Sequence, residues 1–189
     1  MRASRSYQRT AVRRSDAQLA RAAVRDAASR AQALSEQYDA ADARSAEIKR
    51  AIERREWLNR WVAPVSHYQI TATFGEGGGL WSEDHTGLDF AAPEGTPVMA
   101  TAAGEVTSTT YDTSYGNQIV ITHDDGTQTW YCHLSSFYVS PGDTVNPGTT
   151  IGAVGSTGNA TGPHLHLEVH PYGAAAVDPY SYLQAKGAL

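Results

Sequence analysis

The residues with the clearest capacity for chemistry are two histidines one residue apart, His164 and His166. They lie in the alternating stretch 164–169, in which leucines and a valine share one face and the histidines share the other. Side chains two residues apart on a strand project from the same face, about 7 Å apart at roughly 3.3 Å per residue. If the leucines take the core, both imidazoles face away from it. One metal ion can then bind one or both of them.

A second pair of metal-ligand types, His85 and Asp89, lies within a His-Thr-Gly-Leu-Asp stretch. A straight strand would hold the two side chains some 13 Å apart, at about 3.3 Å per residue, which is too far for one metal ion. Gly87 permits the bend that would bring them together. The spacing alone is common by chance, but its joint occurrence with His-x-His is less so. Because Cys132 is the only cysteine, any metal must be held mainly by histidines and carboxylates.

The alternating run 127–134 offers a further candidate, either Cys132 or His133. On a regular strand Trp130 and Leu134 share the face of Cys132, whereas His133 lies on the opposite face. Both can reach one site only if the strand is irregular. We choose His133, because a free cysteine is most often a small buried apolar group.

Two side chains near these candidates admit two interpretations each. Glu168 shares the face of His166, and it either supports that histidine or is an exposed strand carboxylate. The remaining histidines, His67, His123 and His170, are interpreted as surface or packing residues.

Short strands must position the candidate residues. From residue 68 onward, apolar alternations are broken by turn residues every eight to twelve positions, which is typical of an antiparallel β domain. Asp124-Asp125-Gly126 predicts a hairpin, and Ser140-Pro141-Gly142-Asp143 a further turn. All 17 Gly and all 8 Pro follow residue 60. The sequence therefore predicts a mainly-β domain over 61–189.

The segment before this domain has a helical pattern. Its apolar residues recur at steps of three and four: Ala17, Ala20, Val24, Ala27, Ala31, Leu34, Tyr38, Ala41, Ile48 and Ile52, with Ser45 as a polar interruption. We call these positions the seam. They predict a long helix over 16–58, opened by a capping box from Ser15 and Gln18, within a helical or coiled-coil segment 15–60 that follows a basic tail 1–14. Because half of the apolar seam residues are alanine, a lone helix and a weak coiled-coil dimer both stay open.

Charge divides the chain at the same place. Residues 1–60 carry 14 basic and 8 acidic groups, net +6, whereas 61–189 carry 1 basic and 12 acidic groups, net −11. The acidic domain gives no support to nucleic acid as a partner.

The chain has no run of eighteen apolar residues, so no transmembrane segment is predicted. We read no secretory signal either, because Arg13-Arg14 and Asp16 interrupt the place of an apolar core.

The motifs together resemble a known family. They are His85-Thr-Gly-Leu-Asp89-Phe, Gly116-Asn-Gln, Trp130-Tyr-Cys-His133-Leu-Ser and Gly155-Ser-Thr-Gly-Asn-Ala-Thr-Gly-Pro-His164-Leu-His166-Leu-Glu. In order and spacing they resemble the lysostaphin-type zinc peptidases. The resemblance spans residues 68–183 and leaves residues 1–60 outside it.

The resemblance implies a lysostaphin-like antiparallel β domain with a groove. One Zn²⁺ per chain would be held by His85, Asp89 and His166, with water at the fourth position. His133 and His164 would be catalytic: one would handle the proton of the water or of the leaving amine, and the other would stabilise the oxyanion. Which histidine does which stays open. The reaction implied is hydrolysis of peptide bonds in the cross-bridges or stem peptides of bacterial peptidoglycan, outside the cell at its wall.

Substrate contacts are expected from Trp81, Asn117 and Tyr131. The loop 74–84 lacks the Tyr that some family members use to assist the transition state.

Two alternatives to an active peptidase are a catalytically latent or inactive relative that activates cell-wall amidases, and a wall-binding module. The presence of all three ligand positions, together with His133 and His164, favours the enzyme.

Overall fold

A computed structural model describes residues 2–77 and 84–189, with side chains from residue 12 onward. The chain divides into two compact units, Met1–Glu53 and Arg54–Leu189. We describe each unit by itself. The predicted domain boundaries stay a prediction.

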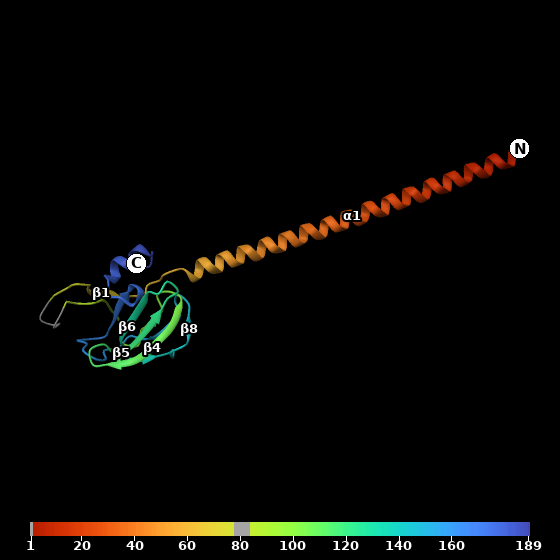
Figure 1. The fold of residues 1–189 in the computed structure, drawn as a ribbon. Coiled ribbons are helices and arrows are strands. Elements are labelled where there is room, and N and C mark those ends of the chain that lie inside the picture. The colour runs from red at the N-terminus through yellow and green to blue at the C-terminus, as the bar shows by residue number, and fades with distance from the viewer. Residues whose placement is uncertain (1, 78–83) are drawn as a thin grey trace. The chain divides into compact units, whose positions relative to one another are not determined.

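Helix α1 (Arg2–Leu58) accounts for the first unit and continues a few residues beyond it (Figure 1). The predicted long helix is confirmed, but its predicted start at Ser15 is wrong. Residues 2–14 contain neither Gly nor Pro, and five of them are Arg, which favours helix. A serine inside such a stretch costs the helix only a few tenths of a kcal/mol, roughly, so a capping motif does not force a start there.

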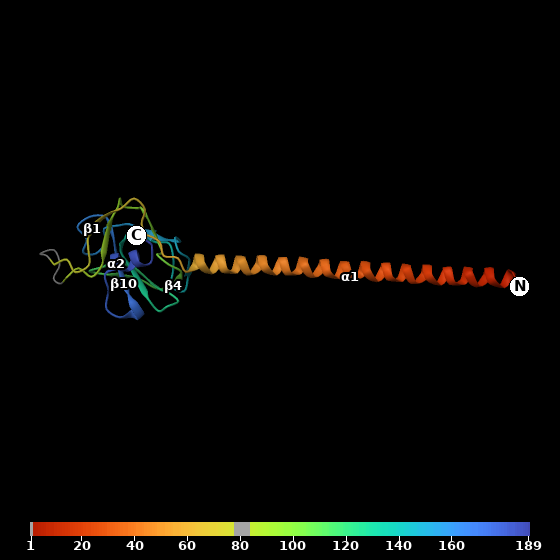
Figure 2. The same ribbon diagram turned by 90° about the horizontal axis from the view of Figure 1, so that it is seen from above.

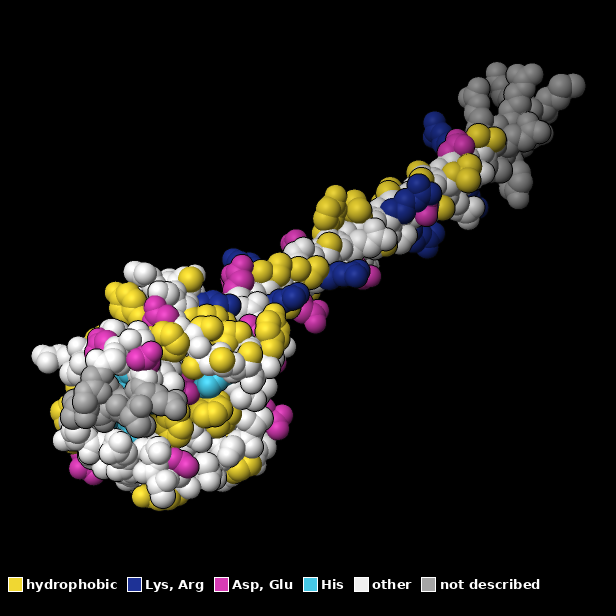
Figure 3. Space-filling model, turned by 60° about the vertical axis from the view of Figure 1, so that its left-hand side comes forward, with side chains coloured by type: hydrophobic (Ala, Val, Ile, Leu, Met, Phe, Trp, Pro, Cys, Tyr) yellow, Lys and Arg dark blue, Asp and Glu magenta, His cyan; other side chains and the backbone are white. Residues whose placement is uncertain are grey.

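The seam of α1 is exposed along its whole length. Leu34 is 51% exposed and Ile48 54%. Hydrophobic side chains alternate with charged ones along the helix (Figure 3). Ion pairs such as Arg30–Asp26, at 2.7 Å, lie four residues apart on this surface, where such pairs contribute little. The structure therefore does not show a coiled coil.

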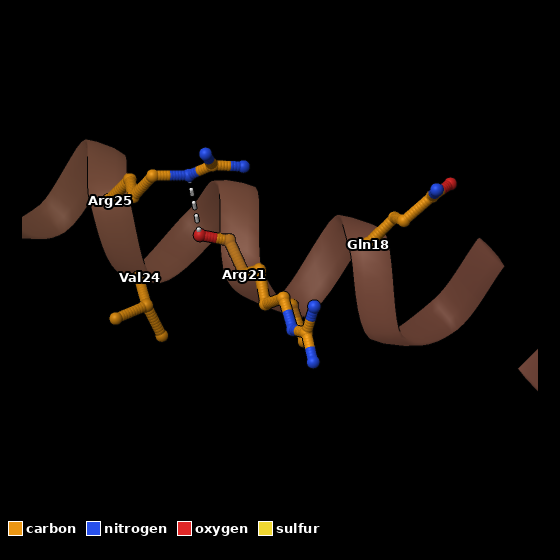
Figure 4. Close-up of a pocket in the computed structure, with 5 residues that line it drawn as sticks. Gln18, Arg21, Val24 and Arg25 are labelled. Carbon is orange, nitrogen blue, oxygen red and sulfur yellow. Dashed lines mark hydrogen bonds between the residues drawn. The ribbon is translucent and has the colours of Figure 1, made fainter. Parts of the chain in front are cut away.

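A shallow hollow on α1 has walls that all belong to this one helix (Figure 4). It is lined by Gln18, Ala20, Arg21, Val24 and Arg25. Arg25 Nε donates to the Arg21 carbonyl at 3.4 Å across it. No facing element closes the hollow within the described residues, so it offers little burial to a small molecule.

The second unit is an antiparallel β domain, which confirms the mainly-β prediction. Among the described residues, its larger sheet has the strand order β1-β2-β10-β6-β5-β4-β8. The strands are β1 (Gln69–Ala72), β2 (Leu88–Ala91), β10 (His164–His170), β6 (Gln128–Leu134), β5 (Gly116–Thr122), β4 (Gly104–Asp112) and β8 (Thr144–Val145). The long strands β4, β5 and β6 lie side by side in Figure 1, and β10 is labelled in Figure 2.

A smaller sheet packs with the larger one around a common core. Its order is β3 (Pro97–Met99), β9 (Thr150–Ala153) and β7 (Ser136–Phe137). The 3₁₀ turn η1 (Pro171–Gly173) and helix α2 (Pro179–Ala185) follow β10. Phe90, Ile151, Leu165, Leu167 and Leu183 are among the fully buried core side chains. Leu165 and Leu167 thus take the core, as predicted.

A β-bulge in β6 alters which side chains face the core. Register shifts between the pairs Asn117↔Leu134 and Ile119↔Tyr131, so β6 has one more residue than β5 there. His133 lies in this bulge, and its backbone is left-handed, with φ 62°. Tyr131 and Leu134 consequently both reach the core although they are three residues apart. The regular alternation predicted for this strand is therefore wrong.

No helix in the described part of the chain is long and apolar enough to span a membrane.

The hydroxyl of Tyr131 should contribute measurably to stability. It is fully buried and accepts a hydrogen bond from the Thr101 amide at 2.9 Å. Tyr131→Phe leaves that buried amide without its partner, at a cost of about 1–3 kcal/mol in the free energy of unfolding. Urea titration measures the loss. Tyr111→Phe, at a site 63% exposed, is the control and should change stability by less than about 0.5 kcal/mol. Equal stabilities of the two variants would contradict this assignment.

Candidate active site

Three buried side chains converge where β2 and β10 pair. Asp89 lies in β2 directly across from His166 in β10, and His85 lies in the segment that precedes β2. His166 Nδ1 is 2.8 Å from Asp89 Oδ1 and 3.0 Å from His85 Nε2, and His85 Nε2 is 3.2 Å from Asp89 Oδ1. Within the described ranges, this is the group of side chains able to share a metal ion.

Gly87 makes this convergence feasible. A Cβ at this position would lie 2.5 Å from the Leu167 carbonyl oxygen and 2.6 Å from the His166 ring. The chain can therefore approach β10 closely only because residue 87 has no side chain. The predicted bend between His85 and Asp89 is present. Backbone bonds between His85 and Glu76 (3.0 Å) and Gly75 (2.8 Å) hold the incoming segment.

Hydrogen bonds on the far side of each ring determine which nitrogen carries a proton. We assign the protons from the acceptors that face each nitrogen. His85 Nδ1 donates to the Thr73 carbonyl at 3.0 Å, and His166 Nε2 donates to Glu168 Oε1 at 3.1 Å. The nitrogens that face Asp89 are therefore the ones that could coordinate a metal ion.

This donor set fits zinc. Zinc takes nitrogen and oxygen ligands at about 2.0–2.2 Å in a tetrahedron, which separates neighbouring ligand atoms by roughly 3.3 Å. The three distances among His85, Asp89 and His166 are 2.8–3.2 Å, close to that spacing. Burial would raise the pKa of the Asp89 carboxyl, but hydrogen bonds from His166 and His85 hold it well below its usual range. Asp89 is therefore anionic at neutral pH.

Glu168 anchors His166 from behind. It is 1% exposed and accepts hydrogen bonds from four side chains: Thr86, Tyr115 at 3.0 Å, His166, and His170 at 2.6 Å. Burial opposes ionisation of Glu168, yet these donors hold its pKa well below the usual range. Of the two interpretations of Glu168, the supporting role fits the structure, because the carboxylate is not exposed.

His170 extends this network. Its Nδ1 donates to the Ala174 carbonyl at 2.8 Å while its Nε2 faces Glu168. Burial would lower the pKa of His170, but the bond to Glu168 raises it. The ring also stacks on Trp130, with 4.2 Å between centroids. Sequence reasoning treated His170 as a surface or packing residue, although its place two residues beyond Glu168 on the same strand face could have indicated its partner.

His133 and His164 flank His85, Asp89 and His166. Their ring centroids are 4.7 Å apart, and that of His133 is 5.8 Å from that of His166. His133 Nδ1 donates to the Thr157 carbonyl at 2.7 Å, and His164 Nδ1 donates to the Gly162 carbonyl at 2.8 Å. Each ring therefore keeps its Nε2 available to the site.

Electrostatics distinguish these two histidines. Burial lowers the pKa of His133 to about 4, and the Thr157 carbonyl offsets only part of that effect. His133 is therefore neutral at pH 7 and able to accept a proton. His164 Nε2 lies 3.7 Å from Asp89 Oδ2, so it faces a negative charge.

The three expected substrate contacts have different outcomes. Trp81 lies outside the described residues. Asn117 is half-buried, and its side-chain Nδ2 donates to the Leu134 carbonyl at 2.8 Å. Tyr131 is fully buried in the core, with its hydroxyl bonded to Thr101, so it serves the core and offers no surface to a substrate. The β-bulge at His133 places Tyr131 in the core, and no pattern in the sequence predicts that bulge.

Comparisons with known proteins agree with this geometry. The model of peptidase family M23 matches residues 83–179. DD-carboxypeptidase/endopeptidase Mpg of Neisseria meningitidis is 50% identical over 97 residues, covering 51% of this chain and 22% of Mpg. Peptidoglycan DD-endopeptidase ShyC of Vibrio cholerae is 44% identical over 84 residues, covering 44% of this chain and 19% of ShyC. The chain thus spans about a fifth of the length of these relatives.

A solved structure matches nearly in full. The catalytic domain of the antimicrobial peptidase lysostaphin from Staphylococcus simulans aligns with a TM-score of 0.59 and 35% identity, covering 68% of this chain and 96% of that domain. The family match covers more than half of the chain, and the site lies within the matched residues. The chain belongs to peptidase family M23.

Proposed function

We propose that this chain is a zinc-dependent endopeptidase that hydrolyses peptide bonds in bacterial peptidoglycan. Membership of family M23 supports hydrolysis of a peptide bond, and relatives such as ShyC, a peptidoglycan DD-endopeptidase, support the substrate class. The same relatives support action at the bacterial cell wall, outside the cell.

One observation carries the proposal: one ring nitrogen from each of two histidines and a carboxylate oxygen face one buried space. His85, Asp89 and His166 hold these donor atoms within 4.8 Å of one another. Burial would lower the pKa of His166, but its hydrogen bonds to Asp89 and Glu168 raise that pKa to about 9, so this buried space favours a shared positive charge. A metal ion bound by all three side chains would supply that charge. Three protein ligands leave a position open, and an open position is typical of catalytic zinc sites.

The residues around the site divide the remaining work. Zinc held by His85, Asp89 and His166 would lower the pKa of a water molecule towards about 7 and polarise the substrate carbonyl. Glu168 keeps the proton of His166 on Nε2, so that Nδ1 stays directed at the site. Thr73 does the same for His85 through its carbonyl.

We assign proton transfer to the flanking histidines. His133 is neutral at pH 7 with an available Nε2, so it accepts the proton of the attacking water. His164 Nε2 lies 3.7 Å from Asp89 Oδ2, on the same side of the site as His133. His164 takes the other role, in which its ring stabilises the oxyanion and hands a proton to the leaving amine.

The alternatives of an inactive amidase activator or a wall-binding module are not favoured. Neither needs a complete set of ligands, nor two further histidines whose Nδ1 protons are held by carbonyls. Such a set of buried polar groups is costly to maintain without a reaction to perform.

Two substitutions should separate metal binding from proton transfer. His166→Ala removes a ligand, so the purified chain should lose tightly bound zinc and all chelator-sensitive release of peptides from peptidoglycan. His133→Ala should keep about one zinc ion per chain while kcat falls about 100- to 10,000-fold, because only the proton acceptor is lost. Metal analysis and release of amines from purified peptidoglycan measure the two effects.

A matched control comes from the exposed His67. His67→Asn tolerates the left-handed backbone there, φ 56°, and should leave both zinc content and rate unchanged. Full activity of either site variant would contradict the assignment. Circular dichroism confirms that each variant is folded.

We also propose weak self-association of two copies through the seam of α1. The seam side chains are exposed and recur at three- and four-residue steps, a pattern that a second helix can cover. Because half of them are alanine, little apolar area is buried per turn and the dimer is weak.

Sedimentation equilibrium tests this proposal. The chain should gain mass with concentration, and Ile48→Lys, which places a charge in the seam, should abolish that gain. Ala43→Lys, outside the seam, adds the same charge and should not. A mass that is monomeric at every concentration, or equal effects of the two variants, would contradict dimerisation through the seam.

A further inference from the structure

The loop 154–163, which joins β9 to β10, is held against β5 and β6 at an unusually short distance. A Cβ at Gly116 (φ 63°) would lie 2.3 Å from Thr157 Oγ1, and one at Gly158 (φ 72°) would lie 2.3 Å from the Gly116 amide nitrogen. At Gly155 a Cβ would lie 2.4 Å from the Ser135 amide nitrogen. The loop therefore rests backbone against backbone, and glycine is required at three of its contacts.

Thr157 connects this loop to the bulge in β6. Its hydroxyl accepts from the Asn117 amide at 3.0 Å and donates to the Leu134 carbonyl at 2.9 Å. Asn117 and Leu134 are the strand partners next to the bulge. The hydroxyl thus bridges a donor and an acceptor at the place where the bulge disturbs the ladder between β5 and β6.

The carbonyl of the same residue meets His133. It lies 2.7 Å from His133 Nδ1, and the His133 backbone is held by a further bond, from its amide to the Tyr115 carbonyl at 2.8 Å. Because the hydroxyl and the carbonyl both belong to Thr157, the hydrogen bonds of the hydroxyl to β5 and β6 fix the position of the carbonyl. Both ends of the contact are therefore tied to the bulge.

We propose that Thr157 is a positioning residue for His133: its hydroxyl anchors the loop at the bulge, so that its carbonyl keeps the imidazole proton on Nδ1 and leaves Nε2 directed at the site. The inference rests on the proposed function for the role of His133 in proton transfer. The orientation of the ring does not depend on that role.

The test uses the zinc-loaded full chain and two variants. Thr157→Val removes the hydroxyl at nearly constant size, whereas Thr157→Ser keeps it. Nitrogen-15 NMR of the His133 ring should show the Nδ1–H tautomer in the parent chain and in Thr157→Ser, and a shift towards Nε2–H in Thr157→Val. The kcat on peptidoglycan should fall about 10- to 100-fold in Thr157→Val only. Zinc affinity, measured by competition with a chelator, should be unchanged in both variants.

Ser135→Ala is the control for a general loosening of the loop. Its hydroxyl donates to the Val154 carbonyl at 3.0 Å, at the other end of the loop, and its loss should leave the His133 tautomer unchanged. A dominant Nε2–H tautomer in the parent chain would overturn the inference, even where Thr157→Val fails to fold. An unchanged tautomer and rate in folded Thr157→Val would overturn it too.

The two proposals fail in different ways. If the parent chain releases no peptide while Thr157→Val shifts the tautomer as expected, the proposed function fails and the positioning of the ring stands. If the parent chain is active and Thr157→Val equals it in tautomer and rate, the proposed function stands and this inference fails.

Discussion

Hydrogen bonds on the outer nitrogens of four histidines are the interaction on which the site depends. In each ring one nitrogen donates to a fixed acceptor, a backbone carbonyl for His85, His133 and His164 and the carboxylate of Glu168 for His166. A neutral imidazole with one nitrogen committed in this way presents a lone pair on the other. The four acceptors thus determine which nitrogen of each ring faces the site.

The β scaffold supplies those acceptors through local departures from regularity. Gly87 lets the segment that bears His85 approach β10, and the bulge at His133 directs that ring away from the core. The buried ion pair of Glu168 and His170 lies behind His166. Buried charges are expensive unless they are fully hydrogen-bonded, and Glu168 has four donors. Packing of the sheet core and positioning of the site are therefore achieved by opposite faces of the same strands.

The sequence predicted more of the site than of its support. His85-x-x-x-Asp89 and His164-x-His166 were recognisable as metal-ligand types whose joint occurrence is uncommon by chance, and the family resemblance then selected His85, Asp89 and His166. Alternation in β10 correctly assigned its leucines to the core. Tyr131 was assigned to substrate because nothing in its neighbours reveals a bulge. The carbonyls of Thr73 and Thr157 left no signal, since a backbone group has no residue type. The predicted helix start at Ser15 was wrong because residues 2–14 also favour helix, and a capping motif inside a helical stretch does not end it.

The proposed reaction needs both the fixed histidines and one metal ion to hydrolyse a peptide bond of the bacterial wall. Purified peptidoglycan of several cross-bridge types, incubated with the zinc-loaded chain and examined by mass spectrometry, tests this most directly. We expect soluble fragments with a new amine and a new carboxyl terminus at one kind of peptide bond, and none when a chelator has removed the metal. Intact peptides from every wall, with zinc confirmed in the protein, would contradict the proposed reaction.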